Sequence, residues 1–369
     1  MHKKIIIIAT ESSGDYLGYK LINSLNKYDK NIKFYGIGGL LMEKSNFKSL
    51  IPIEKLAVNG IVEVLFRIFN FIFLINKTIL FIKKINPDLI ITIDSPSFNY
   101  RVVKKIQGLR PKTKFFHYVA PTVWAWKEKR ALQFSNVYDQ IFTLFSFEPS
   151  FFKSFKVRTR YVGHPIFFEK KRYNRNIKKR KIITFFPGSR INEIKSIFPK
   201  MLVIMEALLI KYPDFDLKIV AVPHLVDEIR KYFKKNIFEI IYSQKEKEKI
   251  MRNSFFAMAT SGTVTLELAY FKIPMIVVYD SNFLTSLIIK KTVKIKWACI
   301  VNIIFNKTII PEFLFEKYNL KDILIGIDKI ISSLEIRNKQ KFYFEKLPSK
   351  LINRGENPSD LVAKYILDT

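Results

Sequence analysis

Short apolar runs alternate along the chain with longer segments in which apolar residues recur every three or four positions. The first run, at 4–9, is followed by a helical period at 16–25 and by a second run at 33–37. Buried strands of a parallel sheet appear as near-continuous apolar runs, and the connecting helices show a 3.6-residue period. The pattern therefore predicts an α/β fold of the doubly wound, Rossmann-like type.

The same alternation extends through both halves of the chain. Further strands are expected at 88–93, 114–119, 140–144, 160–162, 181–186, 217–222, 238–242, 254–259, 275–278 and 298–301. Because 369 residues exceed the size at which one core usually stops growing, we expect two such domains facing a cleft. The expected parts are an N-terminal domain at 1–168, a charged linker at 169–181, a C-terminal domain at 182–347, and a segment at 348–369 placed to pack back on the first domain.

One helical segment, 61–85, is more apolar than contact with a single core requires. Polar residues interrupt it at helical spacing and exclude an unbroken apolar span of about 20 residues: Glu63, Arg67, Asn70, Lys77 and Lys84. Two interpretations stay open. The helix is either buried on both sides in the core, or it lies at a membrane interface with its lysines at the head groups. In the second case the acyl-chain or membrane contacts include Val64, Ile68, Phe69, Ile72 and Phe73.

The chain is strongly basic, with 63 Lys and Arg against 32 Asp and Glu and a net charge of +31. This charge would attract phosphorylated substrates or anionic lipid, although an excess of Lys beside abundant Ile, Phe and Asn is also typical of codon bias. No nucleic-acid-binding motif accompanies it, so we expect no nucleic-acid partner. The single cysteine, Cys299, excludes a disulfide framework, and the apolar start lacks a cleavage site; both indicate a cytoplasmic location.

Two glycine-containing turns follow predicted strands in the second half. Pro187-Gly188-Ser189-Arg190 follows the strand at 181–186, and Ser261-Gly262-Thr263 separates the strand at 254–259 from a helix. Ligands of open α/β sheets bind beyond the carboxyl ends of strands, where free helix N–H groups and an arginine attract phosphate. The two turns therefore predict a nucleotide diphosphate site. Glu267 lies in the helix that follows Ser261-Gly262-Thr263. Its carboxylate either accepts hydrogen bonds from ribose hydroxyls or is buried and bonded to neighbouring groups of the protein.

Carboxylates stand at the equivalent places in the first half. Asp94 ends the apolar run at 89–93, and Glu11 follows the first strand. A carboxylate at this edge of the sheet suits a general base, and we rank Asp94 first and Glu11 second for this role. The alternative for Asp94 is that it caps the helix that begins near Phe98. His117 and His164 are less favoured as bases, because isolated histidines more often support loops.

No metal site or cofactor is expected. Asp214-Phe215-Asp216 imitates the acidic motif that holds a metal-bound nucleotide, but it precedes its predicted strand and so lies at the wrong end of the sheet. The positive charge that a leaving diphosphate needs is expected to come from Arg190 and backbone N–H groups.

Several short segments, in a fixed order and spacing, carry a family resemblance. They are Glu11–Gly18, Gly36–Gly39, Leu56–Val64, Ile93–Asn99, His117–Trp126, Val162–Pro165, Pro187–Arg190 and Ser261–Thr263 with Glu267. Through them the chain resembles the lipid-A-disaccharide synthase family, the inverting glycosyltransferases of outer-membrane bacteria, over nearly its whole length.

The resemblance implies a two-domain fold of the GT-B type. It also implies transfer of a sugar from UDP-2,3-diacylglucosamine to 2,3-diacylglucosamine 1-phosphate, with release of UDP, in lipid A (lipopolysaccharide) biosynthesis at the inner face of the inner membrane. Asp94 matches the base proposed for the family, and Asn302 matches an asparagine near the donor. Trp124 and Trp126 are expected to pack or to contact acyl chains.

The sequence departs from the family pattern mainly on the donor side. The departures are Leu40, Ser97, Asp280, Phe283, Leu284, Val301 and Phe315. Two other functions stay open: another GT-B sugar-nucleotide enzyme, such as one that transfers N-acetylglucosamine to a peptidoglycan precursor, and a noncatalytic basic protein on anionic membrane. The first usually carries glycine-rich phosphate loops near its start, where the segment Ser12–Asp15 of this chain has only one glycine, Gly14. The second predicts that loss of Asp94 and Arg190 leaves function intact.

Overall fold

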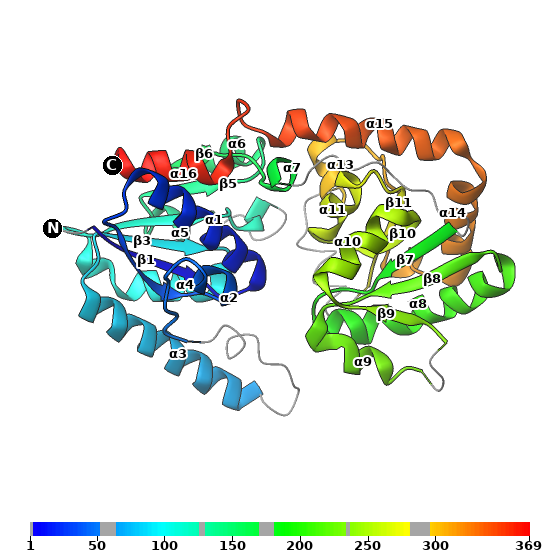
Figure 1. Cartoon of the computed structure of the whole chain (residues 1–369), viewed down its shortest axis with the longest axis horizontal. Helices are drawn as coiled ribbons and strands as arrows, with labels where there is room; N and C mark the ends of the chain where they lie inside the picture. The colour runs from blue at the N-terminus through cyan, green and yellow to red at the C-terminus, as the bar shows by residue number, and fades with distance from the viewer. Residues whose placement is uncertain (1–2, 52–63, 125–129, 170–180, 234–236, 281–295) are drawn as a thin grey trace. The chain divides into compact units, whose positions relative to one another are not determined.

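The chain divides into two compact units, each built on its own sheet (Figure 1). The first unit comprises Met1–Phe168 with Lys350–Thr369, and the second comprises Glu169–Ser349. The computed structural model describes residues 3–51, 64–124, 130–169, 181–233, 237–280 and 296–369. Most of the expected linker, at 170–180, lies outside these residues. Each sheet has six strands, and each pair of neighbouring strands is parallel, which confirms the predicted α/β fold.

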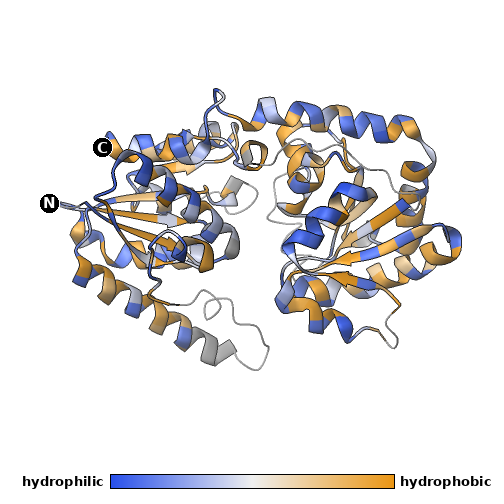
Figure 2. Ribbon diagram, viewed as in Figure 1, coloured by the Kyte–Doolittle hydropathy of each residue, from blue (hydrophilic) through white to orange (hydrophobic). Residues whose placement is uncertain are grey.

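The sheet of the first unit has the strand order β2-β1-β3-β4-β5-β6. Its strands are β1 Lys4–Ala9, β2 Lys33–Ile37, β3 Leu89–Ile93, β4 Lys114–Tyr118, β5 Gln140–Thr143 and β6 Thr159–Tyr161. One face packs against α1 Ser12–Tyr28 and α16 Pro358–Leu367, and the other packs against α3 Val64–Ile85, α4 Pro96–Lys105 and α5 Arg130–Ser135. Because both faces are covered, the central strands are mostly apolar, as Figure 2 shows, with Thr92 and His117 as buried exceptions.

The last part of the chain is built into the first unit. Helix α16 contacts α1, and its Val362 and Ile366 join the core on that face of the sheet. Upstream of α16, Ile352 pairs with Gly163 in an antiparallel bridge. Gly163 has a φ of +91°, and a Cβ there would stand 2.7 Å from the carbonyl oxygen of Leu351. Glycine is therefore required where the returning chain meets the end of β6.

The sheet of the second unit has the strand order β12-β11-β10-β7-β8-β9. Its strands are β7 Lys181–Phe186, β8 Phe215–Val220, β9 Glu239–Ile241, β10 Ser254–Thr260, β11 Met275–Tyr279 and β12 Glu312–Leu314. The helices are α8 Ile191–Lys211, α9 Val226–Arg230, α10 Gln244–Asn253, α11 Val264–Tyr270, α13 Ile300–Phe305, α14 Leu320–Ser332 and α15 Leu334–Leu351. Side chains of α8, α9 and α14 share one core with alternate residues of the strands, and α10 and α11 contact β7 and β10.

The strand expected at 298–301 is wrong. Cys299 is the N-cap of α13, and the strand beside β11 is β12. A run of four apolar residues does not distinguish a strand from the start of a helix. Here the carboxylate of Glu312 accepts hydrogen bonds from the backbone of Ala298 and Cys299, at 2.8 and 3.0 Å, and these bonds hold the segment as a turn.

The acidic motif at 214–216 overlaps a strand. β8 begins at Phe215, so Asp216 lies inside the strand, at its amino end.

The helix expected at 61–85 has a buried and an exposed apolar face. In α3, Ile75, Ile79 and Ile82 are buried, whereas Phe69 and Phe73 are 67% and 63% exposed. Ile72 and Leu80 are also exposed, so the interpretation that the helix is buried on both sides is wrong. Only the backbone of Val64 and Ile68 is described. No helix among the described residues combines the length and the apolar character needed to cross a membrane.

Asp15 is a buried carboxylate whose partners are all backbone groups. Its Oδ1 accepts hydrogen bonds from the N–H groups of Gly39 and Met42 at 2.8 and 3.0 Å, and its Oδ2 accepts one from Leu41 at 3.0 Å. The residue is 5% exposed. These bonds join the first turn of α1 to the start of α2, Leu40–Glu43, and satisfy the orphan N–H groups of that short helix.

We expect Asp15→Ala to destabilise the first unit by about 2–3 kcal/mol, because it leaves several buried N–H groups without an acceptor. Urea unfolding followed by circular dichroism measures the change. Asp227→Ala is the control, since the Asp227 side chain is 91% exposed and its loss should leave the curve unchanged. An Asp15→Ala curve that also matches the parent would show that the three bonds contribute little.

Candidate functional site

The two carboxylates predicted in the first half lie at one edge of the first sheet. β1 and β3 are neighbours, with Ala9 opposite Ile93, so Glu11 and Asp94 follow adjacent strands. Ser95 joins them: its backbone N–H donates to Asp94 Oδ1 at 2.8 Å, and its hydroxyl donates to Glu11 Oε1 at 3.2 Å. The structure therefore brings both candidate bases together through one serine.

The turn that carries Asp94 has an unusual backbone. Asp94 and Ser95 have φ values of +52° and +43°, in the left-handed region that few residues other than glycine adopt. The buried amide of Asn99 holds this turn, because its Nδ2 donates to the carbonyls of Asp94 at 2.7 Å and Ile93 at 3.3 Å. Ser95, and not Asp94, is the N-cap residue of α4. The alternative that Asp94 is the N-cap residue of this helix is therefore wrong.

The two histidines that the sequence offers as alternative bases are neutral; His117 is fully buried and His164 is partly buried. Burial lowers the pKa of His117 to about 3 and the pKa of His164 to about 4. Nδ1 of His117 lies 2.7 Å from the Thr92 hydroxyl in the middle of the sheet, and Nδ1 of His164 accepts from the backbone of Ile166 at 3.3 Å. Both imidazoles support local structure.

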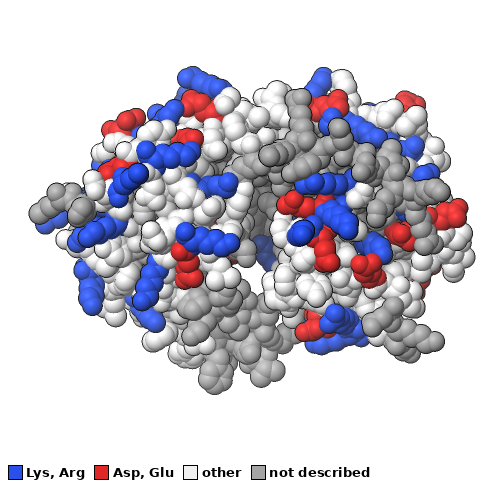
Figure 3. Space-filling view, in the orientation of Figure 1, with Lys and Arg blue, Asp and Glu red and all other residues white. Residues whose placement is uncertain are grey.

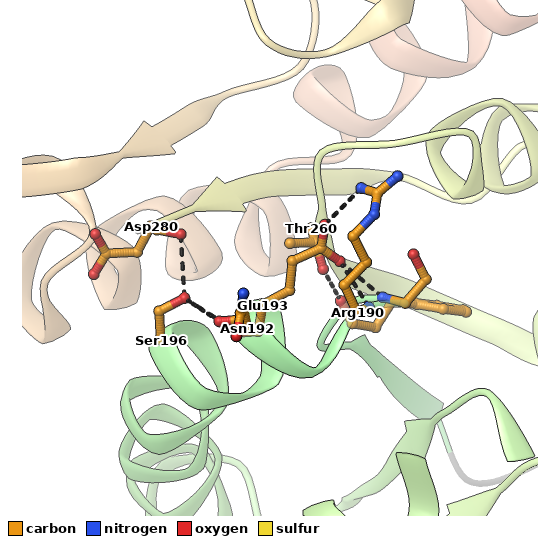
Figure 4. A network of polar contacts seen from close by, with 8 residues as sticks. Arg190, Asn192, Glu193, Ser196, Thr260 and Asp280 are labelled. Atoms are coloured by element: carbon orange, nitrogen blue, oxygen red, sulfur yellow. Dashed lines mark hydrogen bonds and ion pairs between the residues drawn. The ribbon is translucent and has the colours of Figure 1, made fainter. Parts of the chain in front are cut away.

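The two turns predicted to bind a diphosphate also lie side by side. β7 and β10 are neighbours, with Phe186 opposite Ala259, and the Thr260 hydroxyl donates to the carbonyl of Phe186 at 2.6 Å. The turn at 187–190 and the turn at 261–263 therefore leave the same edge of the second sheet, and Figure 4 shows Thr260 beside Arg190. Ser261 is fixed in turn by a 2.7 Å hydrogen bond from its hydroxyl to the carbonyl of Ala298.

A carboxylate that the sequence reading missed lies within the first of these turns. Glu193, in the first turn of α8, accepts from the N–H of Ser189 at 2.8 Å and of Arg190 at 3.3 Å, both at Oε2. The Arg190 guanidinium donates to Oε1 at 3.0 Å. Glu193 stands three residues after the N-cap residue Arg190, and this spacing was the available signal.

Two other residues that were predicted for the donor site, Glu267 and Asn302, make contacts within the second unit. Glu267 pairs with Lys247 at 2.8 Å. Asn302 is fully buried: its Oδ1 accepts from the N–H groups of Ile309 and Ile310 at 2.9 Å each, and its Nδ2 donates to the Ile310 carbonyl at 2.8 Å and to Glu312 at 2.7 Å. A direct contact between Asn302 and a donor would require one of these bonds to break. Desolvation by burial raises the pKa of Glu312.

Comparisons with known proteins agree with one another. The model of the family described as lipid-A-disaccharide synthetase matches residues 5–366. The chain belongs to this family. It is 37% identical to the lipid-A-disaccharide synthase of Rickettsia bellii, over 95% of this chain and 99% of that protein. It is 32% identical to the lipid-A-disaccharide synthase of Gluconobacter oxydans, over 99% of this chain and 90% of that protein.

Solved structures show the fold that this lipid-A-disaccharide synthetase family member shares with other proteins. The UDP-GlcNAc 2-epimerase of Neisseria meningitidis, solved with UDP-GlcNAc, matches with a TM-score of 0.67 at 13% identity, over 99% of this chain and all of that one. A glycosyltransferase of Rickettsia africae matches with a TM-score of 0.56 at 13% identity, over 100% of this chain and 99% of that one. The predicted GT-B type is confirmed.

The departures from the family pattern have varied surroundings in this family member. Asp280, after β11, pairs with Lys200 at 2.6 Å. Leu40 is 72% exposed, Ser97 is exposed in α4, and Val301 is buried in α13. Phe315 has a φ of +55°. Phe283, Leu284 and Trp126 lie outside the described residues, and only the backbone of Trp124 is described.

Within the described ranges, no three His, Cys, Asp or Glu side chains gather as metal ligands.

Proposed function

We propose that this chain is a lipid-A-disaccharide synthase: it joins UDP-2,3-diacylglucosamine to 2,3-diacylglucosamine 1-phosphate and releases lipid A disaccharide 1-phosphate and UDP. The observation that carries the proposal is the match of the family model over 5–366, together with relatives of that name at 32% to 37% identity. These relatives favour this activity over the peptidoglycan-precursor transferase and over a noncatalytic basic protein.

In the proposed reaction, the acceptor hydroxyl oxygen bonds to the anomeric carbon of the donor while the bond from that carbon to the diphosphate oxygen breaks. Asp94 takes the hydroxyl proton, and Glu11 orients the acceptor. Attack opposite the leaving group inverts the anomeric configuration. The turn at 187–190, through Gly188, Ser189 and Arg190, and the turn at 261–263 would stabilise the charge that develops on UDP.

The direct test uses the purified full-length protein with both diacylglucosamine substrates. We expect equal amounts of UDP and of a disaccharide 1-phosphate, detected by chromatography and mass spectrometry. Release of UDP without a disaccharide would indicate hydrolysis of the donor, and transfer from UDP-N-acetylglucosamine to a peptidoglycan precursor would favour the rival enzyme. Either result would overturn the proposal.

The exposed face of α3 supports a second part of the proposal, peripheral contact with anionic membrane at the cytoplasmic face of the inner membrane. Its apolar residues are Phe69, Ile72, Phe73 and Leu80, and Lys77, Lys83 and Lys84 are exposed on the same helix. Apolar side chains with adjacent lysines suit the boundary between acyl chains and anionic head groups. The lysines and arginines are otherwise spread over the visible face of each unit (Figure 3), so α3 is distinguished by its apolar residues.

We expect the double variant Phe69→Ser and Phe73→Ser to bind acidic phospholipid vesicles at least about tenfold more weakly, because burying one phenylalanine contributes about 1.5–3 kcal/mol. Cosedimentation with vesicles measures binding. Phe342→Ser is the control, since Phe342 is 51% exposed and belongs to α15 of the second unit. Undiminished binding by the double variant would rule out α3 as the contact.

A further inference from the structure

The turn between β7 and α8 encloses a carboxylate of its own chain. Three donors converge on Glu193: the backbone N–H groups of Ser189 and Arg190 reach Oε2, and the guanidinium of Arg190 reaches Oε1 (Figure 4). The Glu193 side chain is only 14% exposed, whereas the side chain of Arg190 is 73% exposed. The turn therefore binds an anion, and in this structure that anion is Glu193.

The shape of the turn matches this occupant closely. Gly188 has a φ of +124°, and a Cβ there would stand 2.6 Å from Glu193 Oε2. Any other residue at this position would push the carboxylate out. The missing side chain leaves room for one oxyanion beside the two N–H groups, and a phosphate oxygen needs the same donors at similar distances.

A carboxylate and a phosphate cannot share these donors, because each N–H bonds one oxygen well and the two like charges repel. We propose that Glu193 occupies the anion-binding turn in the nucleotide-free protein and leaves it when the diphosphate of the UDP-sugar binds. Glu193 then sets the affinity of the turn for nucleoside diphosphates and promotes the release of UDP by returning. This inference rests on the proposed function, since it assigns the diphosphate to the turn at 187–190.

The simpler alternative is that Glu193 only caps α8. A glutamate at the third helical position commonly accepts from the N-cap N–H, and Arg190 is the N-cap residue here. Two observations go beyond such a cap: the same oxygen also takes the N–H of Ser189, and the other oxygen takes the guanidinium. The two roles predict different changes in UDP affinity when the charge of Glu193 is removed: tighter binding for a competitor, and equal or weaker binding for a cap.

The test is titration calorimetry of UDP with the full-length protein and its Glu193→Gln variant. Glutamine keeps an oxygen for the cap but removes the charged competitor, so we expect UDP to bind about five- to tenfold more tightly. Product inhibition by UDP should strengthen by a similar factor. Uridine, which has no phosphate, should bind the two proteins equally. Glu206→Gln, an exposed change on the same helix, is the matched control and should leave UDP affinity unchanged.

The outcomes separate this inference from the proposed function. A parent protein that binds no UDP would overturn the proposed donor site itself. UDP binding by the parent, with equal or weaker binding by Glu193→Gln, would overturn only the competitor role and leave Glu193 as a cap. If Glu193→Gln does not fold, as judged by circular dichroism, Glu193→Ala takes its place with the same expected tightening.

Discussion

Asp94→Asn is expected to lower turnover by about two to four orders of magnitude with little change in UDP affinity, because the variant lacks the carboxylate that we propose takes the proton from the acceptor. The change is nearly isosteric. Asparagine tolerates the left-handed backbone at this position, and its amide oxygen can still accept the N–H of Ser95. The measurement is kcat from UDP release, with the Kd for UDP measured separately.

Two further variants sharpen this result. Asp29→Asn removes a carboxylate at the far end of α1, where it accepts the N–H of Asn31, and should retain full activity. Glu11→Gln should cost less activity than Asp94→Asn, because glutamine still accepts from the Ser95 hydroxyl. Normal turnover in Asp94→Asn would refute its role as base, and a larger loss in Glu11→Gln would transfer that role to Glu11.

Arg190→Ala is expected to cost about 2–4 kcal/mol of transition-state stabilisation, because the variant lacks the charged donor that we propose for the leaving diphosphate. At 1.36 kcal/mol per factor of ten, kcat/KM should fall by about 30- to 1000-fold. Steady-state kinetics at saturating acceptor measures this change. The variant removes only one of the three donors to Glu193, so the start of α8 should stay folded.

Arg230→Ala is the matched control for Arg190→Ala. Arg230 is the last residue of α9. Among the described residues, its ion-pair partner is Asp227. We expect its kinetics to match the parent protein. If Arg190→Ala also turned over normally, the diphosphate would have to be held elsewhere, and the turn at 187–190 would lose its proposed role.

The long apolar runs predicted the sheets well, and the parallel-strand rule predicted that the candidate site residues gather at one edge of each sheet. The carboxyl ends of neighbouring parallel strands meet at one edge, so Glu11 and Asp94 had to lie near each other once β1 and β3 were paired. The pairing itself depends on strand order, which a single sequence does not reveal. The sequence alone therefore could not predict that Ser95 bonds to both carboxylates, nor that Asp94 and Ser95 adopt a left-handed backbone conformation.

The failures arose where local pattern is ambiguous or where side chains bind backbone. The run Ala298–Val301 is too short to separate a strand from a helix start, and the carboxylate that decides it, Glu312, comes from β12. The placement of Asn302 near the donor stays a prediction, and the sequence did not show that its amide bonds to the backbone of Ile309 and Ile310 and to the carboxylate of Glu312. Glu193 had a visible signal in its spacing from Arg190, yet that spacing does not show that its carboxylate reaches into the turn.

The return of α16 to α1 makes the first unit discontinuous in the chain, whereas the second unit is one uninterrupted stretch. Because Glu169–Ser349 forms its unit without any later residue, this stretch can fold while the first unit still lacks Val362 and Ile366 on one face of its sheet. A purified chain truncated just before α16 should therefore hold a protease-resistant second unit attached to a first unit that proteases still cut.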